Sequence, residues 1–269
     1  MARRATYIKE NAAEWDHVLL LDAGDFVSSS SPKYELKIEY LLRGMKQMNY
    51  DAINLGERDF LLGANYLENL KEKYKLPFIS ANIYHSDSTK LFTEPYVIKK
   101  FKPKKHMDAD VGELKVGIFG ILMTRPTLVY KSDEPKLVTT NPYKAAEKMV
   151  RELENKCDVI VAIAHTNSAE INKLIDRVKG IDVVVGGHDY MRRANSANPD
   201  NVMVVQTGTK GQYIGDVKLN IDEKKQIITR DGRIMTLGKN IKDDPDIAKL
   251  VQKYRRESSP QHSSKTTRQ

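Results

Sequence analysis

The chain has 269 residues, of which 40% are hydrophobic, and it carries a net charge of +8. This length suits one large domain or two small ones, and the hydrophobic share is sufficient for a buried core. No apolar run reaches the roughly 18 residues of a membrane-spanning helix, so no membrane span is predicted. Cys157 is the only cysteine, which excludes an internal disulfide, and the sequence after Met1 lacks the apolar stretch of a signal peptide.

The first third of the chain alternates helices with short apolar strands. The spacing of its apolar residues predicts helices over 2–14, 32–49 and 64–74. Strands are predicted over 17–22, 51–55 and 77–82. This alternation is typical of an α/β fold, in which helices cover a sheet.

The rest of the chain continues the pattern and then becomes richer in β-structure. Residues 84–114 are expected to form a hairpin or meander, and the prolines of 124–141 favour a long surface loop. Further strands are predicted over 115–122, 158–164, 182–185, 202–206, 213–221 and 226–235. Further helices are predicted over 142–156, 168–178 and 244–256. We therefore expect one domain over residues 1–256, followed by a disordered polar tail over 257–269.

Four predicted strands are followed by polar residues that a buried strand does not need. These residues are Asp25, Glu57, His165 and His188. Taken singly, each has an ordinary structural explanation, such as a helix cap, a charged turn or a hydrogen-bonded histidine. Carboxylates and imidazoles that meet at one edge of a sheet are, however, ligands suited to Zn²⁺, Mn²⁺ or iron. The four residues together therefore predict a metal site.

Several longer motifs surround these residues. They include Leu20-Leu21-Asp22-Ala23-Gly24-Asp25, Pro77-Phe78-Ile79-Ser80-Ala81-Asn82-Ile83, Val116-Gly117-Ile118-Phe119-Gly120 and Gly186-Gly187-His188. In order and spacing, over about residues 2–256, they resemble the calcineurin-like metallophosphoesterase superfamily, most closely the catalytic domain of bacterial 5′-nucleotidases. The resemblance implies a four-layer α/β/β/α sandwich of two mixed sheets. It also implies a two-metal centre at the strand ends and hydrolysis of phosphate esters by a metal-activated water.

The sequence departs from the family pattern at both metal-binding motifs. The family's Gly-Asn-His-Glu-Phe-Asp reads Gly56-Glu57-Arg58-Asp59-Phe60-Leu61 here, so a glutamate replaces the ligand asparagine. The histidine that protonates the leaving group is replaced by Arg58, which stays charged and cannot act as an acid. The family's Gly-His-x-His reads Gly187-His188-Asp189-Tyr190, which puts Tyr190 at the position of the last histidine ligand.

By resemblance, one metal ion would be held by Asp25, Glu57, His165 and His188, and a second by the bridging Asp25 together with Tyr190. One divalent ion (Mn, Zn, Fe or Mg) is expected, with room for two. For Arg58 two roles stay open: it binds the substrate phosphate, or it pairs with a neighbouring carboxylate. Asp59 would serve as a proton donor if its pKa were raised.

The family's first motif, Asp-x-His at the end of an initial strand, should lie before residue 1, so the first strand is expected to be missing. Without that strand, the sheet would have an exposed edge or a groove that could pair with another chain. The second, nucleoside-binding domain of the 5′-nucleotidases has no counterpart in the residues after 256, which indicates a chain shortened at both ends.

The sequence therefore favours a metal-dependent, 5′-nucleotidase-like hydrolase of phosphate esters. The alternative is a non-catalytic metal- or phosphate-binding domain, which would bind its ligand without turnover. The expected partner is a phosphorylated small molecule such as a nucleotide. Nucleic-acid binding has only the net charge in its favour, and no glycine-rich dinucleotide motif follows any predicted strand. The compartment is not determined by the sequence, although proteins of this family are often periplasmic or extracellular.

Overall fold

The computed structural model of the protein describes residues 1–27, 34–86, 89–103, 112–123, 127–128, 136–196 and 198–259. The helices are α1 (Ala2–Ala12), α2 (Glu35–Gln47), α3 (Ala64–Tyr74), α4 (Pro142–Leu153), α5 (Ser168–Arg177) and α6 (Pro245–Glu257), with a short 3₁₀ helix, η2 (Glu57–Phe60). The strands are β1 (Leu21–Asp22), β2 (Ala52–Asn54), β3 (Phe78–Ile79), β4 (Ile83–His85), β5 (Tyr96–Phe101), β6 (Leu114–Leu122), β7 (Thr127–Leu128), β8 (Leu137–Thr139), β9 (Val159–His165), β10 (Val183–Gly186), β11 (Arg192–Asn195), β12 (Met203–Thr207), β13 (Tyr213–Ile221) and β14 (Ile227–Thr236).

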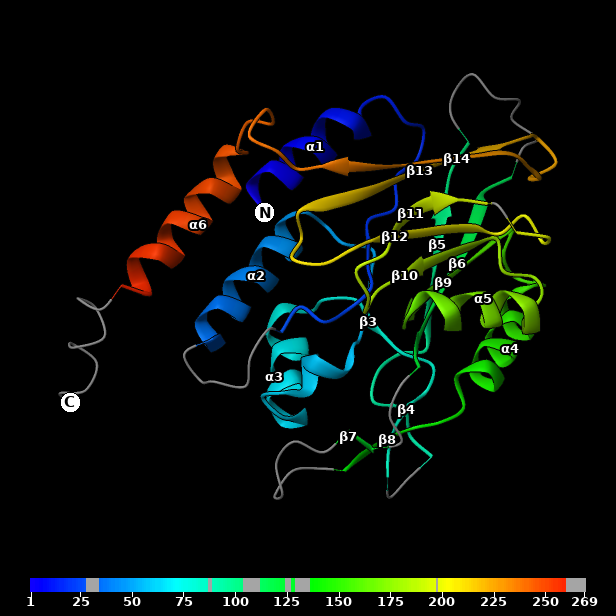
Figure 1. The fold of residues 1–269 in the computed structure, drawn as a ribbon, viewed down its shortest axis with the longest axis horizontal. Coiled ribbons are helices and arrows are strands. Elements are labelled where there is room, and N and C mark those ends of the chain that lie inside the picture. Colours follow the sequence, from blue (N-terminus) through cyan, green and yellow to red (C-terminus); the bar gives the residue numbers. More distant parts are fainter. Residues whose placement is uncertain are drawn as a thin grey trace.

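A six-stranded mixed sheet forms the centre of the molecule (Figure 1). Its strand order is β11-β12-β10-β9-β6-β5, with parallel pairing from β12 to β6 and an antiparallel strand at each edge. Every residue of β9 is buried. A continuous apolar run such as Val159–Ala164 is typical of a parallel strand that is covered on both faces, which explains why this strand could be predicted from the sequence.

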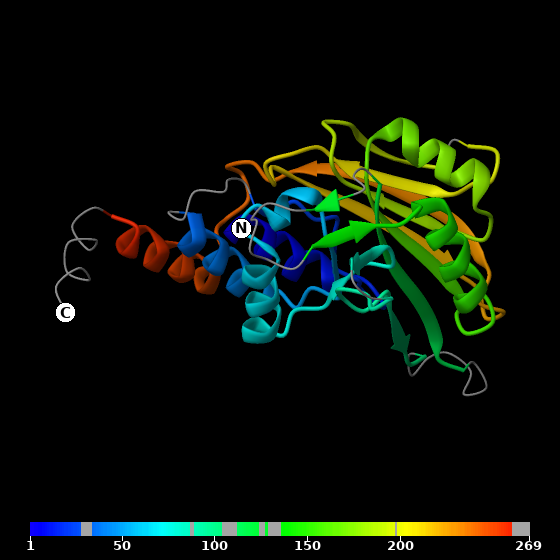
Figure 2. The same cartoon turned by 90° about the horizontal axis from the view of Figure 1, so that it is seen from below.

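Helices and a second strand layer cover the two faces of this sheet. Helices α4 and α5 pack on one face, where Ala146 and Leu174 share a core with Phe119 of β6. The other face packs against β2 and β3. The outer layer on that side contains α2 and α3, which share a core with β2, and Figures 1 and 2 show them on the opposite side of the molecule from α4 and α5. This is the expected four-layer α/β/β/α arrangement.

The second strand layer is divided. It consists of the parallel sheet β1-β2-β3 and the separate antiparallel pair β13-β14. The expected strand 17–22 is therefore reduced to β1, because only Leu21 and Asp22 pair with β2. Two mixed sheets were predicted from the sequence, whereas the structure has one mixed sheet of six strands, the two sheets of this divided layer, and a small fourth sheet, β4-β8-β7.

Two further differences from the predicted elements involve non-local pairing. The expected loop 124–141 contains β7 and β8, and β8 pairs with β4, which lies some fifty residues earlier in the chain; its Leu137 is fully buried. Strand β11 was not predicted, because Arg192-Arg193-Ala194-Asn195 lacks apolar alternation and is a strand only through its pairing with β12. The expected tail was predicted to begin at Glu257, which is still the last residue of α6. The tail residues from 260 onward lie outside the described part of the chain, as does Pro32, the expected start of the second helix.

None of the helices in the described residues combines the length and the apolar character of a membrane span.

Asn54 connects the two strand layers just below the strand ends that form the site. It is fully buried in β2, and its Nδ2 donates to the carbonyl oxygens of Ile121 in β6 (2.9 Å) and Ile163 in β9 (3.1 Å). Gly120 of β6 lets the two strand layers approach closely at this point, because a Cβ on Gly120 would lie 2.4 Å from Asn54 Oδ1.

We expect Asn54→Ala to lower the free energy of unfolding by about 1–3 kcal/mol, because two buried hydrogen bonds are lost. Urea denaturation measures the change. The matched control is Asn172→Ala, whose exposed side chain accepts from Arg193 on the surface. Equal effects of the two substitutions would contradict the bridging role of Asn54.

Candidate metal centre

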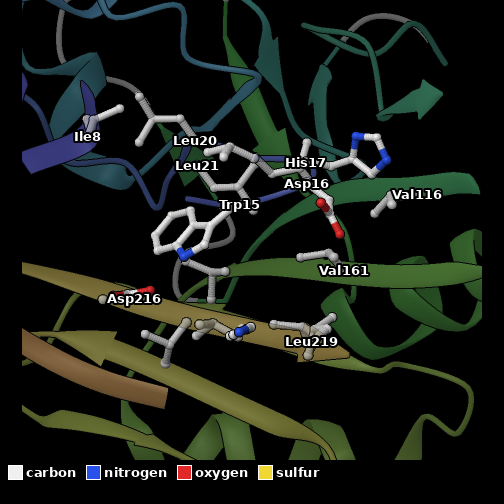
Figure 3. Close-up of a pocket in the computed structure, with 18 of the residues that line it drawn as sticks. Ile8, Trp15, Asp16, His17, Leu20, Leu21, Val116, Val161, Asp216 and Leu219 are labelled. Atoms are coloured by element: carbon white, nitrogen blue, oxygen red, sulfur yellow. The ribbon is translucent and has the colours of Figure 1, made fainter. Parts of the chain in front are cut away.

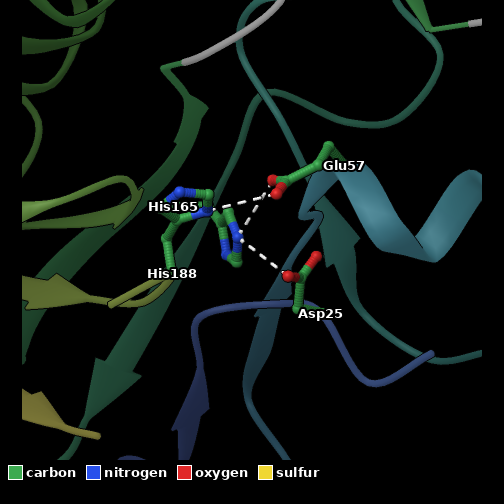
Figure 4. Close-up of side chains that lie close together, drawn as sticks. All are labelled: Asp25, Glu57, His165 and His188. Carbon is green, nitrogen blue, oxygen red and sulfur yellow. Dashed lines mark ion pairs between the residues drawn. The ribbon is translucent and has the colours of Figure 1, made fainter. Parts of the chain in front are cut away.

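The carboxyl ends of β1, β2, β9 and β10 meet at one edge of the strand layers. Asp25 follows β1, Glu57 begins η2 directly after β2, His165 ends β9, and His188 follows β10. Figure 4 shows the four side chains pointing toward one another. One ligand atom from each lies within 4.8 Å of all the others. The four residues singled out by their position after predicted strands are therefore brought together.

A tight turn after β1 places Asp25. Gly24 has φ 90° and Asp25 itself has φ 61°, so the chain reverses through two left-handed residues. A side chain at Gly24 would put its Cβ 2.5 Å from the backbone nitrogen of Gly56, so only glycine lets the turn contact the end of β2. The Oδ1 atom of Asp25 accepts from the backbone N–H of Arg58 at 2.9 Å.

Asp59 fixes this turn through hydrogen bonds to its backbone. It is buried, and its carboxylate accepts from the backbone N–H groups of Asp25 (2.9 Å), Val27 (3.1 Å) and Gly56 (2.9 Å). Burial, followed by the nearby charge of Asp25, raises the pKa of Asp59 to about 7, although the three N–H donors act in the opposite direction. Both carboxylate oxygens of Asp59 thus hold the loops that carry Asp25 and Glu57.

His165 is oriented by the backbone of the same turn. Its Nδ1 lies 2.7 Å from the carbonyl oxygen of Ala23, which can only accept, so Nδ1–H is the donor. This leaves Nε2 facing the two carboxylates, 3.3 Å from Asp25 Oδ2 and 3.2 Å from Glu57 Oε2. A backbone carbonyl that fixes the outer nitrogen is the usual support of a metal-binding imidazole.

His188 completes the cluster from β10. Its Nδ1 lies 3.1 Å from Glu57 Oε1, and its ring meets that of His165 edge-on at 5.3 Å. The residue has φ 77°, and the next residue, Asp189, anchors the loop by accepting from the backbone N–H and the hydroxyl of Ser168. This anchoring role could not be predicted from the sequence, because it depends on a helix that begins twenty-one residues earlier.

The charges of the cluster attract a cation. Burial by itself would lower the pKa of His165, but the carboxylates of Asp25 and Glu57 outweigh it and raise that pKa to about 10. For the acidic Glu57 the signs are reversed. Burial by itself would raise its pKa, but the two histidines and a backbone N–H lower it to about 2. A site whose carboxylates favour positive charge on the ring between them also favours a divalent metal ion.

Unpaired atoms in the cluster fit the same ligand. Among the described residues, His165 Nε2 and Glu57 Oε2 are buried and have no hydrogen-bond partner, although they face each other. Buried polar atoms are normally satisfied, and a metal ion between these two would satisfy both. Two carboxylates and two imidazoles form a donor set suited to Zn²⁺, Mn²⁺ or Fe²⁺.

Comparison with known proteins agrees with this geometry. Models of protein families give no match. A snake venom 5′-nucleotidase of Gloydius brevicauda is 32% identical over 275 residues, which cover 95% of this chain and 46% of the relative. The structure of a 5′-nucleotidase precursor from Thermus thermophilus aligns with a TM-score of 0.79 at 23% identity, covering 95% of this chain and 52% of that one. The structure of the calcineurin-like phosphoesterase YfkN from Bacillus subtilis aligns with a TM-score of 0.76 at 21% identity, covering 96% and 89%.

The chain has the fold of the calcineurin-like phosphoesterases and is similar in sequence to 5′-nucleotidases. The resemblance drawn from its motifs is thereby confirmed. The chain spans about half the length of the curated 5′-nucleotidases that it matches, with 46% of the first of them covered.

The other predicted site residues of the chain lie around the cluster rather than in it. The side chain of Arg58 is exposed next to Glu57, and its backbone contacts Asp25. Tyr190 is 82% exposed on the loop after His188. Asp59 is buried and accepts hydrogen bonds from the backbone of the Asp25 turn. In the sequence, all three lie within two residues of a cluster residue, so only the tertiary structure shows that they lie outside the cluster.

Proposed function

We propose that this protein is a metallophosphoesterase that binds one divalent metal ion through Asp25, Glu57, His165 and His188 and hydrolyses phosphate esters at that site. The observation that supports the proposal is the convergence of two carboxylates and two imidazoles within 4.8 Å. Imidazole nitrogen is a common ligand of Zn²⁺, Mn²⁺ and Fe²⁺, whereas Mg²⁺ prefers oxygen ligands, so the mixed set favours the first three.

The bound metal would polarise a phosphoryl oxygen and lower the pKa of a coordinated water, which then serves as the nucleophile. The residues of the chain position the reactants. The carbonyl oxygen of Ala23 holds the His165 ring with its Nε2 toward the cluster. Asp59 is proposed as a positioning residue rather than a proton donor, because both of its oxygens already accept backbone N–H groups.

The exposed guanidinium of Arg58 is proposed to bind the phosphate of the substrate. A guanidinium presents two parallel N–H groups to a phosphate, whereas an ammonium presents a single point charge. We therefore expect Arg58→Ala to raise the KM for an aryl phosphate about tenfold or more, with Arg58→Lys recovering part of the loss. Steady-state kinetics with added Mn²⁺ measure both constants. An unchanged KM in Arg58→Ala would assign Arg58 to a surface ion pair instead.

The substrate class is proposed from the relatives. Several of them are named 5′-nucleotidases, so a nucleoside monophosphate is the first substrate to test. A second metal ion, with Tyr190 as a ligand, stays a prediction. The exposed position of Tyr190 means that its loop would have to move for that ligand to reach the cluster.

A non-catalytic metal- or phosphate-binding domain is the second candidate. The observation that favours it is Arg58 itself, which stays protonated at the position of the family's proton-donating histidine and cannot protonate a leaving group.

Metal analysis together with a turnover assay tests the proposed function. The purified protein is loaded with Mn²⁺ or Zn²⁺, dialysed and analysed for metal, and hydrolysis of p-nitrophenyl phosphate is followed in parallel. One metal per chain with turnover that is lost in Asp25→Ala supports the hydrolase. One metal without turnover supports the binding domain. No retained metal contradicts both the hydrolase and a metal-binding domain, and leaves phosphate binding as the only form of the second candidate.

A further inference from the structure

Two exposed apolar side chains lie beside the candidate metal centre. Among the described residues, three large hydrophobic side chains are exposed, namely Tyr190 (82%), Met191 (47%) and Ile228 (61%). Two of the three are neighbours, and only Asp189 separates them from the cluster residue His188. Hydrophobic surface residues that occur singly are common, whereas adjacent ones beside a polar site mark a candidate binding surface. We call the side chains of Tyr190 and Met191 the Tyr190 platform.

The loop that carries the Tyr190 platform is held by hydrogen bonds on both sides. The backbone N–H of Met191 donates to Asp189 Oδ1 (2.9 Å), and the carbonyl oxygen of Met191 accepts from the backbone N–H of Gly208 (2.9 Å). Asp189 Oδ1 also accepts from Nε2 of the buried Gln206 (3.1 Å). A ligand that binds to a fixed loop does not have to order it, so more of the contact energy is available for affinity.

The metal cluster is most open on the side of His188. The side chain of His188 is 33% exposed, compared with 20% for Asp25 and 0% for His165. Two residues of extended chain span at most about 7 Å, so the Cα atom of Tyr190 lies within that distance of the Cα atom of His188. A ligand that enters beside His188 with its phosphate at the cluster therefore has the Tyr190 platform within reach of its other end.

The size of the Tyr190 platform favours a small ligand over a protein partner. An aromatic side chain buries about 150–250 Å², whereas a stable protein interface takes roughly 800 Å² from each partner. Aromatic rings stack on one another in offset geometry, and the sulfur of methionine makes favourable contacts with aromatic rings. The occupant that fits a tyrosine beside a methionine is therefore a single planar ring.

A cavity of about 580 Å³ lies elsewhere in the fold (Figure 3). Its lining mixes apolar side chains such as Leu21 and Val161 with the charged Asp16 and Asp216. None of the four cluster residues lines it, so a ligand inside this cavity would not contact the metal centre. The ring of a substrate whose phosphate lies at the cluster is therefore recognised on the surface around His188 rather than in this cavity.

We propose that Tyr190 and Met191 bind the planar ring of the substrate, such as the base of a nucleoside monophosphate, while its phosphate lies at the metal centre. The proposal rests on the proposed function, because it needs a phosphate at the cluster. It predicts a preference for phosphate esters that carry a planar ring over esters of a sugar alone. A metal ligand at Tyr190 would use the phenol oxygen, whereas stacking uses only the face of the ring, so the two roles can be separated.

Calorimetry with two ligands that cannot be hydrolysed tests the proposal. The ligands are the 5′-methylenephosphonates of adenosine and of ribose, which share the phosphonate and the sugar and differ in the base. Their C–P bond is not cleaved by a phosphate-ester hydrolase, so binding is measured without turnover. We expect the protein loaded with Mn²⁺ to bind the adenosine ligand about tenfold more tightly than the ribose ligand, because stacking of a base on an aromatic side chain has an effect of this size.

Three variants identify the residue that recognises the ring. Tyr190→Ala should reduce the preference for the adenosine ligand to about threefold or less, because the stacking surface is lost. Tyr190→Phe should keep the preference, because the ring remains. The matched control is Ile228→Ala, which removes the third exposed hydrophobic side chain, in β14, and should leave the preference unchanged.

The proposal is overturned if the unaltered protein shows no preference, or if the preference persists in Tyr190→Ala. Turnover of p-nitrophenyl phosphate alongside either result would leave the proposed function standing. Loss of the preference in Tyr190→Phe also overturns the proposal, and simultaneous loss of one bound metal ion would assign the phenol oxygen to a second metal site. Failure of both ligands to bind overturns the proposal together with phosphate binding at the cluster. Selective binding without turnover supports the ring site and contradicts only the hydrolase.

Discussion

Replacing His165 by glutamine is expected to weaken the binding of Mn²⁺ or Zn²⁺ about 100-fold or more. His165 supplies the buried Nε2 that lies 3.3 Å from Asp25 Oδ2 and 3.2 Å from Glu57 Oε2. An amide is a much weaker ligand than imidazole for these ions, and even loss of an outer-shell partner typically costs 10–100-fold in affinity. Isothermal titration calorimetry on the metal-free protein measures the change.

His85→Gln is the matched control for this experiment. His85 ends β4, and its ring lies tilted against that of Phe92 with ring centroids 5.7 Å apart, outside the cluster. Its replacement should leave the metal affinity unchanged. Equal metal binding by His165→Gln and the unaltered protein would show that the four-residue cluster is not the metal site, and the proposed function would fail with it.

Gly56→Ala is expected to have an effect of similar size by a purely steric route. A Cβ at this position would lie 2.2 Å from Asp25 Oδ1 and 2.7 Å from His165 Cε1. The backbone here has φ −100°, which any residue adopts, so the substitution causes no conformational strain of its own. The methyl group must push the Asp25 carboxylate away from the cluster, because His165 is fixed by its bond to Ala23.

We therefore expect Gly56→Ala to weaken metal binding at least 30-fold and to lower the free energy of unfolding by about 1–3 kcal/mol, as overpacking of a buried site usually does. Calorimetry and urea denaturation measure the two changes. The matched control is Gly112→Ala, where the nearest atom to the new Cβ, Lys225 Nζ, is 3.7 Å away. Unaltered metal binding in Gly56→Ala would mean that Asp25 is not a ligand.

The local sequence was a good guide to the strands of the central sheet and to the four residues of the cluster. Strands β6, β9 and β10 are continuous apolar runs, and such runs are easily recognised. The carboxyl ends of parallel strands lie at one edge, so polar residues directly after such strands converge whatever the details of packing. Asp25, Glu57, His165 and His188 could therefore be selected from the sequence.

Pairing between distant segments could not be predicted in this way. Strands β8 and β11 exist through partners elsewhere in the chain rather than through their own apolar pattern. The roles of Arg58, Asp59 and Tyr190 also could not be predicted from the sequence, because these residues differ in burial. Asp59 is buried against the Asp25 turn, whereas Arg58 and Tyr190 are exposed.

The sequence alone thus predicted the fold class, the resemblance to 5′-nucleotidases and the four residues of the cluster, because these follow from local periodicity and from motifs of fixed spacing. The tertiary structure alone revealed that Asp59 holds the Asp25 turn and that Asn54 joins the strand layers. Each of these depends on atoms that are distant in the chain and meet only after folding, so no local pattern encodes them.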